Sequence, residues 1–329
     1  MDGERGGVRP GGGPRVPGGG GRRVAGDGAV PRAEAGASVV HVSAAVRGVL
    51  PVPAAMQRRA GSGQLVRVRR GTYVGAEEWQ VLDERARQVV RVRAVHAAAA
   101  RAPVFSHWSA AAVLGLPVVG RRDADVHVVQ APAGGGRSHG DVVRHAARGD
   151  VPVAVCDGIT VTSAARTVVD LARVGGVVAG VVAGDAAVRH GWAGVEELRL
   201  EVERVGSGRG VLAARAAVEL VDGRSESPGE SLSRVRMAER GLPAPVLQHE
   251  VRDRHGFVGR VDFWWPDVGV VGEFDGRVKY GTGAADVLWE EKLREDRLRA
   301  AGLAVARWTW SAAWAGDPMV ARLRAAGVR

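Results

Sequence analysis

The sequence predicts an α+β N-terminal part, winged-helix-like and helical, followed by an α/β domain with a mixed sheet. A basic stretch near residue 65 alternates in the manner of a β-hairpin, helical patterns dominate the middle of the chain, and helices alternate with strands in the C-terminal third. We expect four segments. They are a Gly/Pro/Arg-rich extension over 1–40, a winged-helix-like region over 41–105, an α/β helical middle domain over 106–222 and an α/β domain over 223–329.

Composition narrows the class of protein. The chain has 329 residues and 46% hydrophobic residues, enough for a sizeable core. A single cysteine, Cys156, excludes an internal disulfide and a zinc site built on two or more cysteines. No signal-peptide pattern is present, and the most apolar region, 177–188, is short and contains Asp185. We therefore expect a cytoplasmic protein that does not enter a membrane.

The positive charge is concentrated toward the N-terminal side. The formal net charge is +10, and residues 41–75 contribute six arginines and no acidic residue. Lys279 and Lys292 are the two lysines of the whole sequence, so arginine supplies nearly all of the charge. Such a concentration predicts DNA as a partner, because arginines neutralise phosphates.

The N-terminal segments have distinct patterns. Residues 1–40 lack periodicity and are predicted to be disordered, although a start codon placed too far upstream explains them equally well. The stretch "LVRVRRGTYV" over 65–74 predicts a β-hairpin turning at Gly71, after a short helix, as in a winged helix. Arg67, Arg69 and Arg70 beside the turn are the predicted DNA contacts. The alternative is a solvated basic hairpin without a ligand.

Helices dominate the middle of the chain. We expect helices over 84–101, from Ser106 to Gly115, and over 177–190 and 194–204, with a strand at "ADVHVVQ" and a turn at Asp157-Gly158. His96, His107 and His127 are spread through this part. Each is expected to be a packed or surface side chain and not a ligand.

The C-terminal segment begins at a helix start. Ser227 and Glu230 have the spacing of a capping box, with proline at the first helical position. A strand over 246–252, a hairpin over 259–275, a helix over 286–301, a strand over 303–309 and a helix over 311–325 are predicted to follow. Trp308, Trp310 and Trp314 are expected to pack in the core rather than to stack on bases.

The hairpin places acidic and apolar side chains on opposite faces. If Pro266 and Asp267 form a two-residue turn, Asp262 lies opposite Val271 and Arg260 opposite Glu273. One face then carries Phe263, Trp265, Val268, Val270 and Phe274, and the other carries Asp262, Trp264, Val271, Glu273 and Asp275. A loop with an odd number of residues would break this separation.

Clustered carboxylates need positive charge nearby. They raise one another's pKa, and bound Mg²⁺ relieves the repulsion through oxygen ligands. Asp262, Glu273 and Asp275 are the predicted metal ligands. The alternative is ion pairing with Arg260, Arg277, Lys279 or the following helix.

These residues resemble the PD-(D/E)XK nuclease superfamily, most closely its branch related to very-short-patch repair endonucleases. Asp262 matches the aspartate of the motif, Glu273 matches the (D/E), and Glu230 matches a glutamate on the first helix. Asp275 stands where the family has its catalytic lysine, and Lys279 or Lys292 could supply the ammonium group instead. The resemblance implies a restriction-endonuclease-like domain with catalytic Asp262, Glu273, Asp275, Lys279 and Glu230.

A second resemblance covers about residues 40–315. The stretches "LVRVRRGTYV", "FSHWSAAAVLGLP", "DGITVTSAARTVVDLA" and "SESPGESLSRVRMAERGLP" are together similar to actinobacterial AbiEi-family antitoxins of type IV toxin–antitoxin systems. This resemblance implies a cognate nucleotidyltransferase-like toxin as partner. Two functions follow as expectations: a Mg²⁺-dependent DNA phosphodiesterase, or a non-enzymatic antitoxin and autorepressor whose nuclease-like fold is a scaffold.

Overall fold

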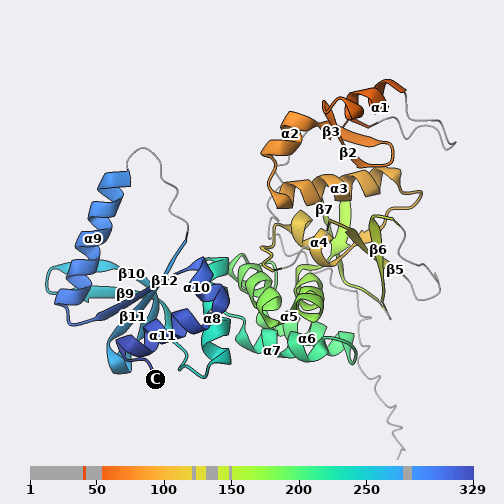
Figure 1. Cartoon of the computed structure of the whole chain (residues 1–329). Helices are drawn as coiled ribbons and strands as arrows, with labels where there is room; N and C mark the ends of the chain where they lie inside the picture. The colour runs from red at the N-terminus through yellow and green to blue at the C-terminus, as the bar shows by residue number, and fades with distance from the viewer. Residues whose placement is uncertain (1–39, 42–53, 121–123, 131–139, 148–149, 277–283) are drawn as a thin grey trace, which may run out of the picture.

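The computed structural model describes residues 40–41, 54–120, 124–130, 140–147, 150–276 and 284–329. The extension predicted over 1–40 therefore lies outside the described residues, apart from Val40. Within the described part, the chain is a mixture of helices and mixed or antiparallel sheets, arranged as three sheets with their helices (Figure 1). The expected mixed α and β character is confirmed.

The N-terminal unit carries the predicted hairpin. It consists of β1 (Val40–His41), α1 (Ala54–Gly61), β2 (Leu65–Arg69), β3 (Thr72–Gly75), α2 (Ala76–Val81) and α3 (Glu84–Ala98). Arg67 pairs with Tyr73 and Arg69 with Thr72, and Gly71 has φ 81°, which favours glycine at the turn. The winged-helix arrangement stays a prediction, because residues 42–53 lie outside the described residues.

The middle unit packs helices against a five-stranded sheet of order β6-β5-β4-β8-β7. Its elements are β4 (Val104–Phe105), α4 (His107–Leu114), β5 (Val126–Gln130), β6 (Val142–Ala146), β7 (Val153–Cys156), β8 (Ile159–Thr162), α5 (Ala164–Arg189), α6 (Val195–Val205) and α7 (Val211–Leu220). Asp157 and Gly158 both have positive φ, 50° and 76°, as the predicted tight turn requires. Phe105 is fully buried in the core, so β4 belongs to this sheet and not to the N-terminal unit.

Helix α5 consists of two helical segments that meet at Gly176. It spans 26 residues in total, Gly176 has a non-helical backbone with φ 81°, and the segment after it matches the helix predicted over 177–190. By length and composition it could cross a membrane, which corrects the expectation that this region is too short. However, 61% of its most apolar stretch is buried inside the protein, and Val181 and Ala183 are fully buried. The helix is therefore a core element of the middle unit.

The C-terminal unit is a four-stranded sheet between two layers of helix. Its elements are α8 (Pro228–Glu239), β9 (Val246–Asp253), β10 (Gly256–Trp265), β11 (Val270–Asp275), α9 (Ala284–Ala300), β12 (Ala304–Thr309), α10 (Trp310–Ala315) and α11 (Asp317–Ala326). The order is β12-β11-β10-β9, with β11 and β12 parallel and the other pairs antiparallel, so the predicted mixed sheet is confirmed. The last predicted helix is two helices, divided at Gly316.

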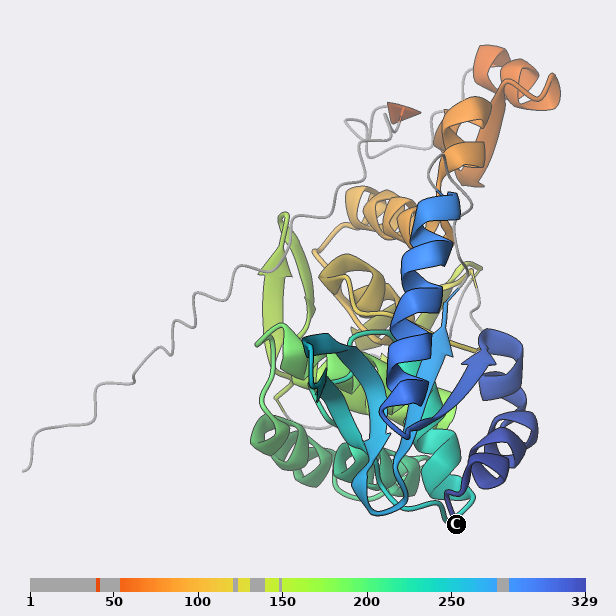
Figure 2. The ribbon, with the colours of Figure 1, turned by 90° about the vertical axis from the view of Figure 1, so that its left-hand side faces the viewer.

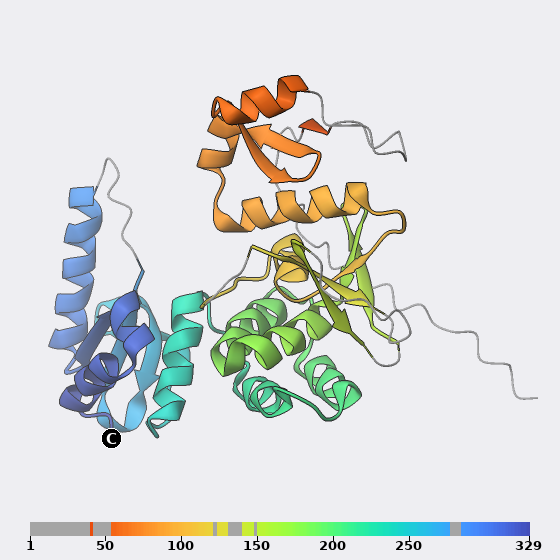
Figure 3. The same cartoon turned by 45° about the vertical axis from the view of Figure 1, so that its right-hand side comes forward.

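The two faces of this sheet have separate apolar cores. Phe263 and Trp308 pack with residues of α8, α10 and α11, whereas Val261 and Val271 pack with Leu298 of α9. Figure 2 shows α9 running across one face of the sheet. Figure 3 shows α8 between this sheet and the helices of the middle unit, close to α5. Helix α8 therefore belongs to the C-terminal unit and also joins it to the middle of the chain.

Candidate functional site

The β10–β11 connection determines which side chains share a face. It has four residues, a turn of 3₁₀ helix over Pro266–Val268 followed by Gly269 with φ 62°. Trp265 therefore pairs with Val270, and Val271 pairs with Trp264. The expected pairing of Asp262 with Val271 is wrong by two residues. Because both loop lengths are even, the acidic and apolar faces stay separate, but Val268, which was expected on the apolar face, lies in the turn and is 48% exposed.

Glu273 is the best-neutralised carboxylate on the acidic face. It lies on β11, and 5% of the residue is exposed. Its Oε1 is 2.6 Å from Nη2 of Arg294 on α9, and its Oε2 is 2.7 Å from Nη2 of Arg307 on β12. Burial raises the pKa of Glu273, and the two guanidinium groups oppose that rise. Both oxygens of a predicted metal ligand are thus occupied by cations of the protein.

Arg307 connects further acids to this pair. Its guanidinium lies 3.7 Å from Asp275 and 3.2 Å from Glu295, and it also contacts Glu291. Register explains part of this arrangement, because β12 runs parallel to β11 and sets Arg307 beside Glu273. Arg260, one of the predicted partners, instead lies 2.7 Å from Glu226. The following helix, another predicted source, supplies Arg294, and the remaining two, Arg277 and Lys279, lie outside the described residues.

Asp262 has a different environment from Glu273. Its Oδ2 accepts a hydrogen bond from the backbone N–H of Phe274 at 2.8 Å, so the side chain links β10 to β11. Burial raises the pKa of Asp262 to about 6; the N–H of Phe274 opposes the rise, and the charges of Glu230 and Glu273 add to it. Asp262 is therefore protonated more readily than an ordinary aspartate.

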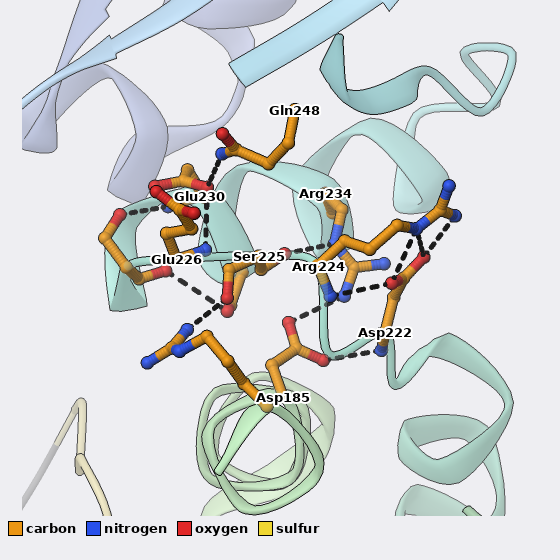
Figure 4. A network of polar contacts seen from close by, with 11 residues as sticks. Asp185, Asp222, Arg224, Ser225, Glu226, Glu230, Arg234 and Gln248 are labelled. Carbon is orange, nitrogen blue, oxygen red and sulfur yellow. Dashed lines mark hydrogen bonds and ion pairs between the residues drawn. The ribbon is translucent and has the colours of Figure 1, made fainter. Parts of the chain in front are cut away.

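Glu230 is held by the start of α8. Ser227 Oγ accepts from the N–H of Glu230 at 3.2 Å, as the predicted cap requires. The Glu230 carboxylate accepts from the N–H of Glu226 at 2.9 Å and from Nε2 of Gln248 at 2.8 Å (Figure 4). The Ser227 half of the predicted capping box is therefore formed, whereas the Glu230 carboxylate bonds to Glu226 and Gln248 in place of the Ser227 N–H.

The same network fixes the C-terminal unit to α5. Arg234 of α8 lies 2.7 Å from the carboxylate of Asp185, and Asp185 also accepts from the N–H of Asp222 at 2.7 Å (Figure 4). Asp185 is 1% exposed, so it requires these partners. Ser225 Oγ accepts from Nε of Arg234 at 2.9 Å and completes the link.

The predicted Mg²⁺ ligands do not assemble into an ion site among the described residues. Asp262, Glu273 and Asp275 provide no group of three ligand atoms within 4.8 Å of one another. Lys279, the predicted source of the ammonium group, lies outside the described residues. Lys292 is exposed, and its ammonium lies 5.8 Å from the centre of the Trp289 ring. Mg²⁺ binding at these acids therefore stays a prediction.

The predicted DNA-contacting arginines differ in solvent exposure and in ion pairing. Arg67 and Arg70 are exposed at the end of the hairpin. Arg69 is partly buried and lies 3.6 Å from Asp141, which precedes β6. The structure therefore places two of the three predicted contacts on the open surface and pairs the third with an acid.

Three histidines meet in the middle unit, among them His107 and His127, for which packed or surface positions were predicted. His107 begins α4, His127 lies on β5 and His145 on β6, and their ligand nitrogens lie within 4.8 Å of one another. Burial and the nearby His145 and His127 lower the pKa of His107 well below its ordinary value. The sequence pattern does not indicate the cluster, because each histidine belongs to a different element. In the sequence, the local signal of the cluster is the stretch "SHWS" over 106–109.

The last tryptophans also depart from expectation. Trp308 is fully buried and its Nε1 donates to Ser233 Oγ at 2.8 Å, which confirms a core role. Trp310 and Trp314 are 40% and 42% exposed, so the expectation that they are core residues is wrong. They line a cleft of about 1110 Å³ together with Trp108 and Phe274.

Comparison with known proteins identifies relatives but no family. The chain is 35% identical over 125 residues to uncharacterized protein Rv2248 of Mycobacterium tuberculosis strain ATCC 25618 / H37Rv and to uncharacterized protein MT2308 of strain CDC 1551 / Oshkosh. The match covers 38% of this chain and 44% of each relative. No family model matches the chain, and no solved structure matches it. The chain thus resembles these two mycobacterial proteins over a part of its length.

Proposed function

We propose that the chain is a non-enzymatic, DNA-binding regulatory protein of the AbiEi antitoxin type, with its arginine hairpin as the DNA contact. The observation that carries the proposal is the solvent exposure of Arg67 and Arg70. Both are exposed beside the turn, and within the described residues neither has an ion-pair partner. Arginines exposed on a hairpin in this way suit contacts with phosphate oxygens.

The charge around the hairpin supports the same conclusion. Residues 54–75 contain five arginines and no aspartate or glutamate. Arg58 and Arg59 lie exposed in the last turn of α1, which packs beside β2. Binding to several phosphates would release condensed counterions, and this release drives sequence-independent affinity for DNA.

The acidic face of the C-terminal unit favours a scaffold over an enzyme. Both oxygens of Glu273 are paired with arginines, and Asp275 occupies the position where the resembled nucleases carry lysine. A metal ion would have to displace Arg294 or Arg307 from a buried carboxylate. Removing Arg307 would leave Asp275 without an ion-pair partner among the described residues, whereas Glu291 keeps Arg294 and Glu295 keeps Arg299.

A Mg²⁺-dependent DNA phosphodiesterase is the second candidate. The element order of the C-terminal unit, a helix, three antiparallel strands, a helix and a parallel strand, is the arrangement that the nuclease resemblance implies. Carboxylates also outnumber cations on the acidic face, and the pKa of Asp262 is raised to about 6 by burial first and then by neighbouring acids. An excess of negative charge favours a cation from outside the protein.

Location and further partners follow from the resemblance alone. We place the protein in the cytoplasm, where DNA and a cognate nucleotidyltransferase-like toxin would be available to it. The toxin would bind a surface other than the hairpin if the protein also represses its own operon. Co-purification of the chain with such a toxin, encoded beside it, would test this part of the proposal.

A single plasmid assay separates the two candidates. Supercoiled plasmid would be incubated with the full chain in Mg²⁺ or Mn²⁺ and then run on native and denaturing gels. The proposal predicts retarded migration without nicking, both for the unmodified chain and for Glu273→Gln. Metal-dependent nicking that Glu273→Gln abolishes would establish the phosphodiesterase instead. Absence of retardation would contradict DNA binding itself.

A further inference from the structure

We propose that His107, His127 and His145 form a binding site for a single transition metal ion of the zinc class. The three side chains come from α4, β5 and β6, and one ligand nitrogen of each lies within 4.8 Å of the others. His127 and His145 are on adjacent parallel strands, where His145 pairs with Val129, two residues from His127. Strand alternation therefore sends both rings to the same face of the sheet.

The three rings are close enough to share an ion, but they are oriented as a stack. Nδ1 of His127 and Nε2 of His145 share a hydrogen bond of 2.8 Å, and the His107 ring stacks on His145 with centroids 3.7 Å apart. Two nitrogens bound tetrahedrally to Zn²⁺ at about 2.0–2.1 Å lie roughly 3.4 Å apart. An ion would replace this hydrogen bond, and the rings, whose planes now differ by 16–31°, would turn so that one nitrogen of each points to a common position.

Surrounding hydrogen bonds hold these side chains in place. Ser106 Oγ lies 3.0 Å from Nδ1 of His107, which leaves Nε2 of that ring for a ligand role. Ser109 Oγ accepts from the N–H of His127 at 2.9 Å, and the N–H of Ser106 donates to the carbonyl of His127 at 3.0 Å. The residues flanking His107 thus position His127 as well. The contact of Ser106 with the His107 ring is of the kind found at metal-binding histidines, because it fixes the ring and its tautomer, whereas the two contacts of His127 fix only its backbone.

His107 also has an unusual backbone. Its φ is 51°, in the left-handed region that residues other than glycine seldom adopt. Strain of this kind is retained where the surrounding structure requires it, often at functional sites. Here the turn from β4 into α4 places the His107 ring over His145.

A pocket connects the cluster with solvent. It has a volume of about 530 Å³ and is lined by His107 and His145 together with Arg166 and Arg173. Arg144 and Arg209 also line the pocket, so it is basic, although Arg166 pairs with Asp170 at 3.0 Å and with Glu201 at 3.2 Å, and Arg173 lies 3.6 Å from the same Asp170. Three imidazoles with an open fourth position are the ligand set of zinc sites that bind an exogenous ligand.

The ligand chemistry separates this site from the C-terminal acids. Imidazole nitrogens bind zinc, cobalt and copper, whereas Mg²⁺ selects carboxylate and water oxygens. The proposal for the histidines is therefore independent of the proposed DNA function. Whether or not the histidines bind metal, the assignment of the hairpin as the DNA contact is unchanged.

Cobalt titration of the untagged full chain tests the site. After removal of metals with a chelator, Co²⁺ should bind with one-to-one stoichiometry and produce the visible absorption of a four-coordinate ion, which Zn²⁺ should abolish by displacement. His107→Gln, His127→Gln and His145→Gln should each weaken binding by about 100-fold or more, and Ser106→Ala by about 10-fold. His96→Gln is the matched control, since His96 is a partly buried histidine that packs near Phe105 outside the cluster.

Thermal unfolding of the metal-free variants checks that each one is folded. His145 lies on a partly exposed strand. If the two buried histidines prove essential for folding, the His145→Gln variant decides whether the metal site exists. Cobalt binding that His96→Gln and Glu273→Gln retain and His145→Gln loses supports the site. An unmodified chain that binds no Co²⁺ overturns it. Binding that survives His145→Gln, or that Glu273→Gln removes, overturns it as well.

Discussion

The guanidinium of Arg294 on α9 lies 2.6 Å from the carboxylate of Glu273 on β11, and this pair joins the helix to the sheet. Gly259 on β10 makes room for it, because a Cβ there would lie 2.9 Å from Cδ of Arg294. Arg294 also donates to the carbonyl of Arg260 at 3.1 Å. One side chain thus neutralises a buried acid and bonds the neighbouring strand.

Removing Arg294 should therefore destabilise the C-terminal unit. Arg294→Met leaves Glu273 with Arg307 alone, and breaking a fully buried pair costs about 3–5 kcal/mol. Because the side chain of Arg294 is 25% exposed, we expect a loss of about 2 kcal/mol in the free energy of unfolding, measured by urea denaturation. Arg299→Met, on the same helix but 60% exposed, should cost about 0.5 kcal/mol. Equal losses would show that Glu273 does not depend on Arg294.

Asp262 gives the unfolding free energy a specific pH dependence. Its folded pKa is raised from 3.8 to about 6 by burial first, so its contribution to stability is fully present below pH 4 and is lost as pH rises through 6. Asp262→Asn keeps an acceptor for the N–H of Phe274 and removes the ionisation. Allowing for partial exposure, the variant should gain about 2 kcal/mol relative to the unmodified chain between pH 4 and pH 7. A constant difference across this range in denaturation experiments would refute the raised pKa.

Gly229 should be intolerant of any side chain. A Cβ at this position on α8 would lie 2.0 Å from Cε1 of Phe274, which packs across the helix start. Gly229→Ala should lower the free energy of unfolding by about 2 kcal/mol, since overpacking forces the ring or the helix to move. Gly61→Ala is the control, because a Cβ there meets nothing within 4 Å. Similar thermal stability of the two variants would contradict the close packing of α8 on β11.

Asp185 and Arg234 should show strong energetic coupling between α5 and α8. Their charged groups are 2.7 Å apart, and the Asp185 side chain is 1% exposed. Arg234→Met alone should cost about 3 kcal/mol because it leaves the buried carboxylate unpaired. In a double-mutant cycle with Asp185→Ala, we expect a coupling energy of about 2 kcal/mol. Additive losses would indicate that the two units are held together by apolar packing alone.

Local patterns in the sequence were sufficient for much of the C-terminal fold. The separation of faces in the hairpin is predictable because it depends on the parity of the loop, and loops of two and four residues give the same result. The exact register is not predictable in this way, since Pro266-Asp267 is an equally good two-residue turn. The cap at Ser227 is predictable because all of its partners are local.

The side chains that meet the acidic face could not be predicted from the sequence. Arg307 reaches Glu273 because β12 pairs in parallel with β11, a contact between residues far apart along the chain. The histidine cluster has the same cause, because His107, His127 and His145 are brought together by the pairing of β4, β5 and β6. Periodicity indicates the element in which each residue lies but not the elements beside it.

The salt dependence of DNA binding tests the central claim most directly. Arg67→Ala/Arg70→Ala removes the two exposed hairpin arginines and leaves Arg69, which is paired with Asp141. Arg215→Ala/Arg324→Ala changes the net charge equally at exposed positions of α7 and α11 and serves as the control.

Fluorescence anisotropy with a labelled duplex at several salt concentrations would give log affinity against log salt. Each phosphate contact adds about 0.9 to the slope, so the hairpin variant should lose about 1.8 from the magnitude of the slope and bind more weakly at low salt. The control variant should keep the slope of the unmodified chain. Equal slopes for the hairpin variant and the unmodified chain would contradict the assignment of the hairpin as the DNA contact.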